Sequence, residues 1–219
     1  MGYVLRTGIS FCDVGGRLLF LDTIADRYFC LGLDGEAAFR SLIVRRAPAQ
    51  GEGAALAGLL RSGLLVETGS DQVPCPFLPP DPPTGSLLDE AGARIRIRDV
   101  AAATAALALA RRSLRRRGLH ATLCRLAERK SEADEVSVRR LGGMVAAFEY
   151  TARLARSHDQ CLIRSIAAAQ LFRRRNLPAD LIIGVRLRPF AAHAWVQTGP
   201  WLVNDRVDTV NTYTPVLSL

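Results

Sequence analysis

The chain has 219 residues, of which 49% are hydrophobic, and its formal net charge at pH 7 is +8. This length allows one large domain or two small ones with packed cores. No apolar stretch is long enough for a bilayer-spanning helix, and the first residues lack the pattern of a signal peptide. Five cysteines without a Cys-x-x-Cys pair argue against a disulfide framework and against structural zinc. We therefore expect a reducing cytoplasm, no metal and no cofactor.

The first 70 residues are predicted to form a small sheet with two helices. Three short strands are expected over residues 8–14, 17–22 and 27–31, and Gly15-Gly16 supplies the turn between the first two. Helices are expected over residues 34–46 and 53–61, followed by a strand over residues 64–67. This order of elements is typical of a winged-helix-like domain.

The charge of this region argues against nucleic acid as its ligand. Its seven arginines are balanced by seven Asp and Glu residues. The second helix carries only Arg61, whereas a recognition helix needs several basic side chains to contact phosphates. An exposed edge strand beside a helix is, in contrast, a good acceptor for an extended peptide. We therefore expect this domain to bind a peptide and not nucleic acid.

A proline-rich run divides the chain. Six prolines lie within residues 69–86, and they exclude a helix or a central strand and favour an extended, semi-rigid spacer. The sequence therefore predicts an N-terminal domain over residues 1–70, a linker over residues 71–86 and a second domain over residues 87–219.

The second domain is predicted to place helices before strands. Helices are expected over residues 97–117, 118–130, 138–156 and 161–175, and strands over residues 180–188, 193–198 and 201–205. The arginine cluster within residues 111–117 is interpreted as a solvated helix end that complements the helix dipole. Helices followed by antiparallel strands predict an α+β fold.

Three residues of this domain form a candidate catalytic group: Cys161, His193 and Asp205. Cys161 opens an amphipathic helix, where backbone N–H groups and the helix dipole favour a thiolate. His193 and Asp205 fall on the second and third of the predicted strands, so an imidazole oriented by a carboxylate can face the thiolate, as in papain-type and transglutaminase-type sites. Each residue alone also has an ordinary interpretation, as a buried thiol, a core histidine and a turn aspartate. Trp195 is interpreted as a wall behind the imidazole.

Three segments carry a more specific resemblance. Cys161-Leu-Ile-Arg-Ser165, the run over residues 173–185 and the run Pro189-Phe-Ala-Ala-His-Ala-Trp-Val196 resemble the lasso-peptide B2 leader peptidases, which are transglutaminase-like cysteine proteases. The first 70 residues resemble, in topology only, their PqqD-type B1 partner, a precursor-recognition element. Gln197 departs from this pattern, because family members commonly carry Glu there. The chain is thus similar to the fused B proteins of lasso-peptide biosynthesis.

The resemblance implies a function and partners. It implies that Cys161, His193 and Asp205 hydrolyse the bond between the leader and the core of a ribosomal precursor, and that an ATP-using, asparagine-synthetase-like cyclase receives the freed core. Binding of the leader strand is expected to involve residues of the third strand and the second helix: Arg27, Tyr28, Phe29, Cys30, Leu31, Leu56 and Leu60. Two alternatives remain open: an acyltransferase that uses the same three residues, and a winged-helix regulator with an inactive enzyme-like domain.

Overall fold

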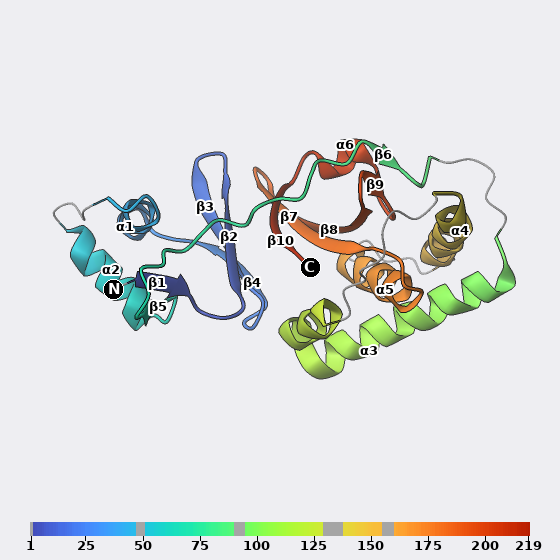
Figure 1. The fold of residues 1–219 in the computed structure, drawn as a ribbon, viewed down its shortest axis with the longest axis horizontal. Coiled ribbons are helices and arrows are strands. Elements are labelled where there is room, and N and C mark those ends of the chain that lie inside the picture. The colour runs from blue at the N-terminus through green and yellow to red at the C-terminus, as the bar shows by residue number, and fades with distance from the viewer. Residues whose placement is uncertain (1, 47–50, 90–94, 129–137, 155–159) are drawn as a thin grey trace. The chain divides into compact units, whose positions relative to one another are not determined.

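The computed structural model describes residues 2–46, 51–89, 95–128, 138–154 and 160–219. The chain divides into two compact units, Met1–Leu78 and Pro79–Leu219 (Figure 1). The division falls inside the proline-rich run. Among the described residues, no helix combines the length and the apolar character that crossing a membrane requires.

The first unit contains a three-stranded sheet, a two-stranded sheet and two helices. Strands β2 (Ile9–Val14), β3 (Arg17–Asp22) and β4 (Arg27–Cys30) form an antiparallel sheet in the order β2-β3-β4. Positive φ angles at Gly15 and Gly16, 58° and 82°, allow the tight turn between β2 and β3. The helices are α1 (Leu33–Ile43) and α2 (Glu52–Arg61). Strand β5 (Leu65–Thr68) pairs with β1 (Gly2–Leu5), a strand that the sequence pattern does not predict.

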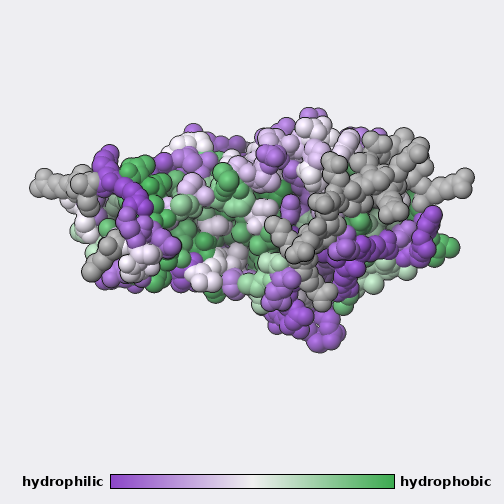
Figure 2. Space-filling model, in the orientation of Figure 1, coloured by the Kyte–Doolittle hydropathy of each residue, from purple (hydrophilic) through white to green (hydrophobic). Residues whose placement is uncertain are grey.

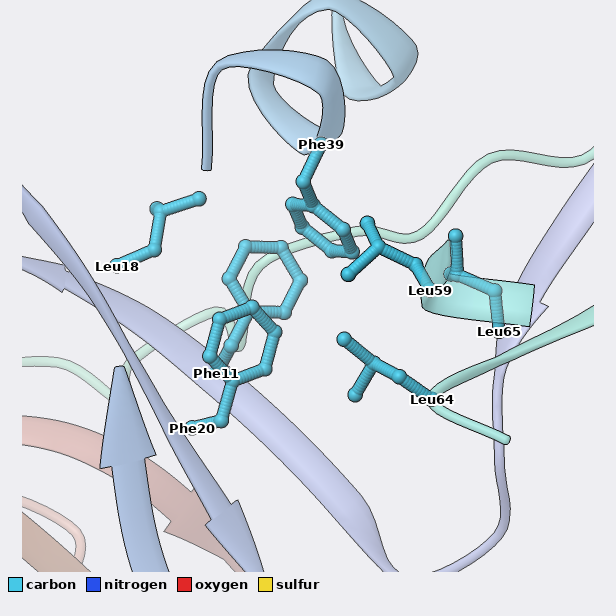
Figure 3. Close-up of a cluster of buried hydrophobic side chains, with 7 residues drawn as sticks. All are labelled: Phe11, Leu18, Phe20, Phe39, Leu59, Leu64 and Leu65. Atoms are coloured by element: carbon cyan, nitrogen blue, oxygen red, sulfur yellow. The ribbon is translucent and has the colours of Figure 1, made fainter. Parts of the chain in front are cut away.

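The core of the first unit is built around three phenylalanines (Figure 3). Phe11 and Phe20 face each other across β2 and β3, and their rings stack at 5.5 Å between centroids. Phe39 of α1 meets both rings edge-on at 5.1 and 5.2 Å. Aromatic pairs of this geometry add to the stabilisation from burial alone. Leucines of β3, α2 and the residues around β5 complete the cluster: Leu18, Leu59, Leu64 and Leu65.

The second unit contains one five-stranded sheet and four helices among its described residues. The helices are α3 (Ile97–Ala127), α4 (Val138–Leu154), α5 (Cys161–Arg174) and α6 (Val207–Val210). The strands are β6 (Gly85–Ser86), β7 (Asp180–Leu187), β8 (Phe190–Thr198), β9 (Trp201–Leu202) and β10 (Thr214–Ser218), in the order β10-β7-β8-β9-β6. All neighbours are antiparallel except β6 and β9. Strand β6 comes from the last two residues of the predicted linker.

Helix α5 packs against β8 on one side and α3 on the other (Figure 1). Residues 166–169 of α5 are completely buried, and three of these four are alanines. Small side chains let the helix approach its neighbours closely. A separate cluster that includes Ile182, Trp195 and Val210 contains residues of β7, β8 and α6. The contacts with β8 and with α3 therefore hold the helix that begins with Cys161 on both sides.

Helix α3 bends at Gly118, where φ is 75° and ψ is 179°. Glycine adopts this backbone conformation without steric cost. The predicted change from one helix to the next at residue 118 is thus confirmed. Figure 2 shows hydrophilic side chains gathered where α3 lies in Figure 1, and arginines 115–117 of this helix are exposed. The helix predicted over residues 118–130 has its predicted end outside the described residues. The same holds for the helix predicted over residues 138–156.

Other predicted boundaries need correction. The first helix ends at Ile43, before Arg45, whose φ of 54° is left-handed. The strand predicted over residues 201–205 ends at Leu202, and Asp205 follows in a bend. Strand β8 begins at Phe190, three residues before the predicted start. Pairing between β7 and β8 continues to Leu187 and Phe190, so the hairpin extends further than the apolar pattern indicates.

Candidate active site

Cys161 occupies the first residue of α5, as predicted, and is half-buried. The preceding Gln160 takes a non-helical conformation, and its side-chain oxygen accepts a hydrogen bond from Arg111 of α3. A backbone hydrogen bond from Leu162 reaches the sulfur. The start of a helix presents N–H groups without intrahelical partners, so this position favours negative charge on sulfur.

His193 lies on β8 between Cys161 and Asp205. Its Nε2 is hydrogen-bonded to Asp205 Oδ2, and its side chain also forms a hydrogen bond with Cys161. Because Nε2 is engaged by the carboxylate, Nδ1 is the nitrogen that faces the sulfur. The imidazole lies 5.1 Å from the Tyr213 ring and 6.2 Å from the Trp195 ring, measured between centroids. Two aromatic side chains therefore limit how the imidazole can move.

Asp205 is fixed on both its main chain and its side chain. Ser86 of β6 donates a hydrogen bond of 2.6 Å to the Asp205 carbonyl, and the Arg206 N–H donates one of 2.8 Å to Oδ1. The other carboxylate oxygen remains for His193. The end of the predicted linker thus contributes directly to the placement of the carboxylate.

The surroundings of Cys161 favour the thiolate. Burial alone raises the pKa of this thiol. Hydrogen bonds from the His193 side chain and the Ala194 N–H, together with the charge of His193 and the Leu162 N–H, outweigh burial and bring the pKa below its usual value. The sulfur is therefore deprotonated at a lower pH than an ordinary cysteine.

His193 shows the complementary shift. Burial lowers the pKa of the imidazole, but the hydrogen bonds and charges of Asp205 and Cys161 raise it to about 9. The two shifts therefore favour a thiolate beside an imidazolium over the neutral pair.

The structure brings Cys161, His193 and Asp205 together, from one helix, one strand and one bend. It also adds side chains that sequence reasoning did not select: Ser86, Ser165, Asn204 and Tyr213. Ser165 and Asn204 lie within the sequence segments used to locate the site, but no pattern distinguished them from neighbouring polar residues. Among the described residues, no group of three or more His, Cys, Asp and Glu side chains is arranged to hold a metal ion.

The residues predicted to bind a peptide all belong to the first unit. Arg27 and Cys30 of β4 are exposed, whereas Tyr28 and Phe29 are half-buried. Hydrophobic residues of β4, the turn after it and α2 pack in part against the phenylalanine core: Phe29, Leu31, Leu56 and Leu60. In the described part of this unit, no strand pairs with the outer edge of β4, while the other edge strand, β2, accepts a hydrogen bond from the Phe77 N–H at Phe11.

Comparison with known proteins identifies the superfamily of the chain. A sequence model of the transglutaminase-like superfamily matches residues 102–218, more than half of the chain, and the chain belongs to this superfamily. It is also similar to the microcin J25-processing protein McjB of Escherichia coli, with 44% identity over 47 residues. That match covers 22% of this chain and spans 23% of the length of McjB. No solved structure matches the chain.

We predict that Cys161 reacts selectively with iodoacetamide at about pH 6, since its lowered pKa increases the share of thiolate. In His193→Ala, loss of the imidazolium and its hydrogen bond raises the thiol pKa, so the labelling rate at pH 6 should fall at least about tenfold. Peptide mass spectrometry measures the modification at each cysteine. Buried Cys12, whose pKa is raised to about 12, serves as the unreactive control. Equal labelling of Cys161 in both proteins contradicts the prediction.

Proposed function

We propose that this chain is a cysteine peptidase that binds the leader of a ribosomal lasso-peptide precursor and hydrolyses the bond between leader and core. The observation that carries the proposal is the hydrogen-bonded series from Asp205 through His193 to Cys161, within a member of the transglutaminase-like superfamily. The partial match to McjB, whose name describes processing of microcin J25, supports a role in lasso-peptide processing.

In the proposed reaction, the Cys161 thiolate attacks the carbonyl carbon at the junction. Backbone N–H groups at the start of α5, including that of Cys161, stabilise the oxyanion, and one such donor contributes about 3 kcal/mol to lowering the barrier. The His193 imidazolium gives its proton to the leaving amine, which departs as the N-terminus of the core. Neutral His193 then accepts a proton from water as water hydrolyses the thioester. Asp205 holds the tautomer of His193 and stabilises its charged form.

The first unit, as a PqqD-like winged-helix element, is proposed to capture the leader. An extended peptide added to the outer edge of β4 gains main-chain hydrogen bonds, and the half-buried hydrophobic residues of β4 and α2 offer contacts for its side chains. Covalent connection of the two units raises the effective concentration of bound precursor for the peptidase. The freed core would pass to an asparagine-synthetase-like cyclase in the same cytoplasmic pathway.

We predict that Cys161→Ala loses cleavage by at least about three orders of magnitude but still binds the precursor, because the nucleophile and the proposed capture site lie in different units. The assay uses a lasso-precursor peptide as substrate, and mass spectrometry detects the products. Ser10→Ala, on β2 of the first unit, is the control and should cleave normally. Cleavage by Cys161→Ala at the normal rate overturns the proposal. A mass-shifted adduct with an amine, in place of free leader, would instead identify an acyltransferase.

We predict that Tyr28→Ala in the Cys161→Ala background weakens precursor binding about tenfold, as loss of an aromatic contact residue at an interface does. Arg61→Ala is the matched control, since Arg61 is exposed and lies outside the proposed contact set. Fluorescence anisotropy of labelled precursor measures both affinities. Unchanged binding by Tyr28→Ala, or equal loss in both variants, counts against capture at β4.

A further inference from the structure

The pairing of strand β8 with its neighbour β9 ends close to the candidate nucleophile. Strand β9 pairs with β8 only at Gln197 and Thr198, and the Val203 N–H extends the contact to the Val196 carbonyl at 2.9 Å. Further along, the backbone of β8 at Ala194 is buried, and no strand of the described residues pairs with it on this side. Buried backbone groups without partners cost free energy, so other groups must take the place of the missing strand.

Side chains supply these partners. Asn204 Oδ1 accepts the Val196 N–H at 2.8 Å, and Ser165 Oγ donates to the Ala194 carbonyl at 2.7 Å. The Ala194 N–H donates to the sulfur of Cys161. The edge of β8 is therefore completed by residues of α5 and of the bend after β9.

The same side chains are joined to each other. Asn204 Nδ2 donates a hydrogen bond of 2.8 Å to Ser165 Oγ. Ser165 lies one turn after Cys161 on α5 and is completely buried, whereas Asn204 immediately precedes Asp205. One serine–asparagine contact thus links the helix that carries Cys161, the strand that carries His193 and the bend that carries Asp205.

We propose that Ser165 and Asn204 are positioning residues that hold the Cys161 sulfur in hydrogen-bonding reach of His193 and Ala194. This inference rests on the proposed role of Cys161 as the nucleophile. Neither side chain is assigned a chemical step. Their effect is to fix the separation between the start of α5 and the edge of β8, on which the orientation of the thiolate depends.

Loss of the Ser165 hydroxyl has a specific consequence. The buried Ala194 carbonyl then lacks its donor, and Asn204 loses its acceptor, so α5 and β8 are free to shift relative to each other. A shift lengthens the hydrogen bonds from Ala194 and His193 to sulfur. A general loss of stability does not produce this change in a molecule that remains folded.

The test compares Ser165→Ala, Asn204→Ala and the double variant with Thr122→Val. Thr122 is a matched control, because its side chain is also completely buried and its hydroxyl donates to the Gly118 carbonyl of α3. The first readout is the pH at which Cys161 alkylation by iodoacetamide reaches half its maximal rate. The second is kcat and KM for cleavage of a lasso-precursor peptide.

We expect each single variant to raise the half-maximal pH by about one unit and to lower kcat about tenfold at unchanged KM, which corresponds to the loss of one hydrogen bond. The double variant should be little worse than either single variant, since both act through one contact. Thr122→Val should keep the normal half-maximal pH.

A folded Ser165→Ala or Asn204→Ala with normal alkylation and normal kcat overturns the inference. Both tryptophans, Trp195 and Trp201, belong to the second unit, so their fluorescence verifies folding there. If Ser165→Ala does not fold, Asn204→Ala decides the question, because Asn204 is only half-buried. Alkylation needs no precursor, so the inference can fail while Cys161-dependent cleavage persists. Cleavage by Cys161→Ala would instead overturn the proposed function, while alkylation would still decide whether Ser165 and Asn204 position the sulfur.

Discussion

The hydrogen-bonded series from Asp205 through His193 to Cys161 is the interaction on which the proposed chemistry of this chain depends. The carboxylate and the sulfur each raise the pKa of the imidazole, and the imidazole in turn lowers the pKa of the sulfur. Burial opposes charge on both members of the pair, so the shifts toward their charged forms depend on contact between the three groups. The fold must therefore hold one helix, one strand and one bend at fixed separations.

The shortness of strand β9 makes these separations possible. Because β9 is only two residues long, the edge of β8 beyond it is open to the start of α5 and to the bend that carries Asp205. Strand β6 fixes that bend from the other side through Ser86, and the small residues at the centre of α5 let this helix pack closely. A longer β9 would place a strand where the sulfur and the Asn204 side chain now meet β8.

Much of the site could be predicted from the sequence because its chemistry is tied to local signals. Cys161 begins an amphipathic helix, and His193 and Asp205 fall on or just after short apolar runs. Ser165, Asn204 and Tyr213 could not be selected, since each acts through a partner distant in sequence and has an ordinary local context. The sequence likewise does not predict strands β1, β6 and β10. Each is short, and each is defined by its partner strand, β5, β9 or β7, more than by its own pattern.

The protonation state of His193 tests the proposed ion pair most directly, and nitrogen-15 NMR of the labelled imidazoles measures it. The chain has three histidines, and His193→Gln assigns the signal. The account predicts that both ring nitrogens of His193 carry protons at about pH 7.5, that the ring titrates near the raised pKa of about 9, and that Asp205→Asn lowers this pKa. A neutral His193 imidazole at that pH in the unmodified protein would contradict it.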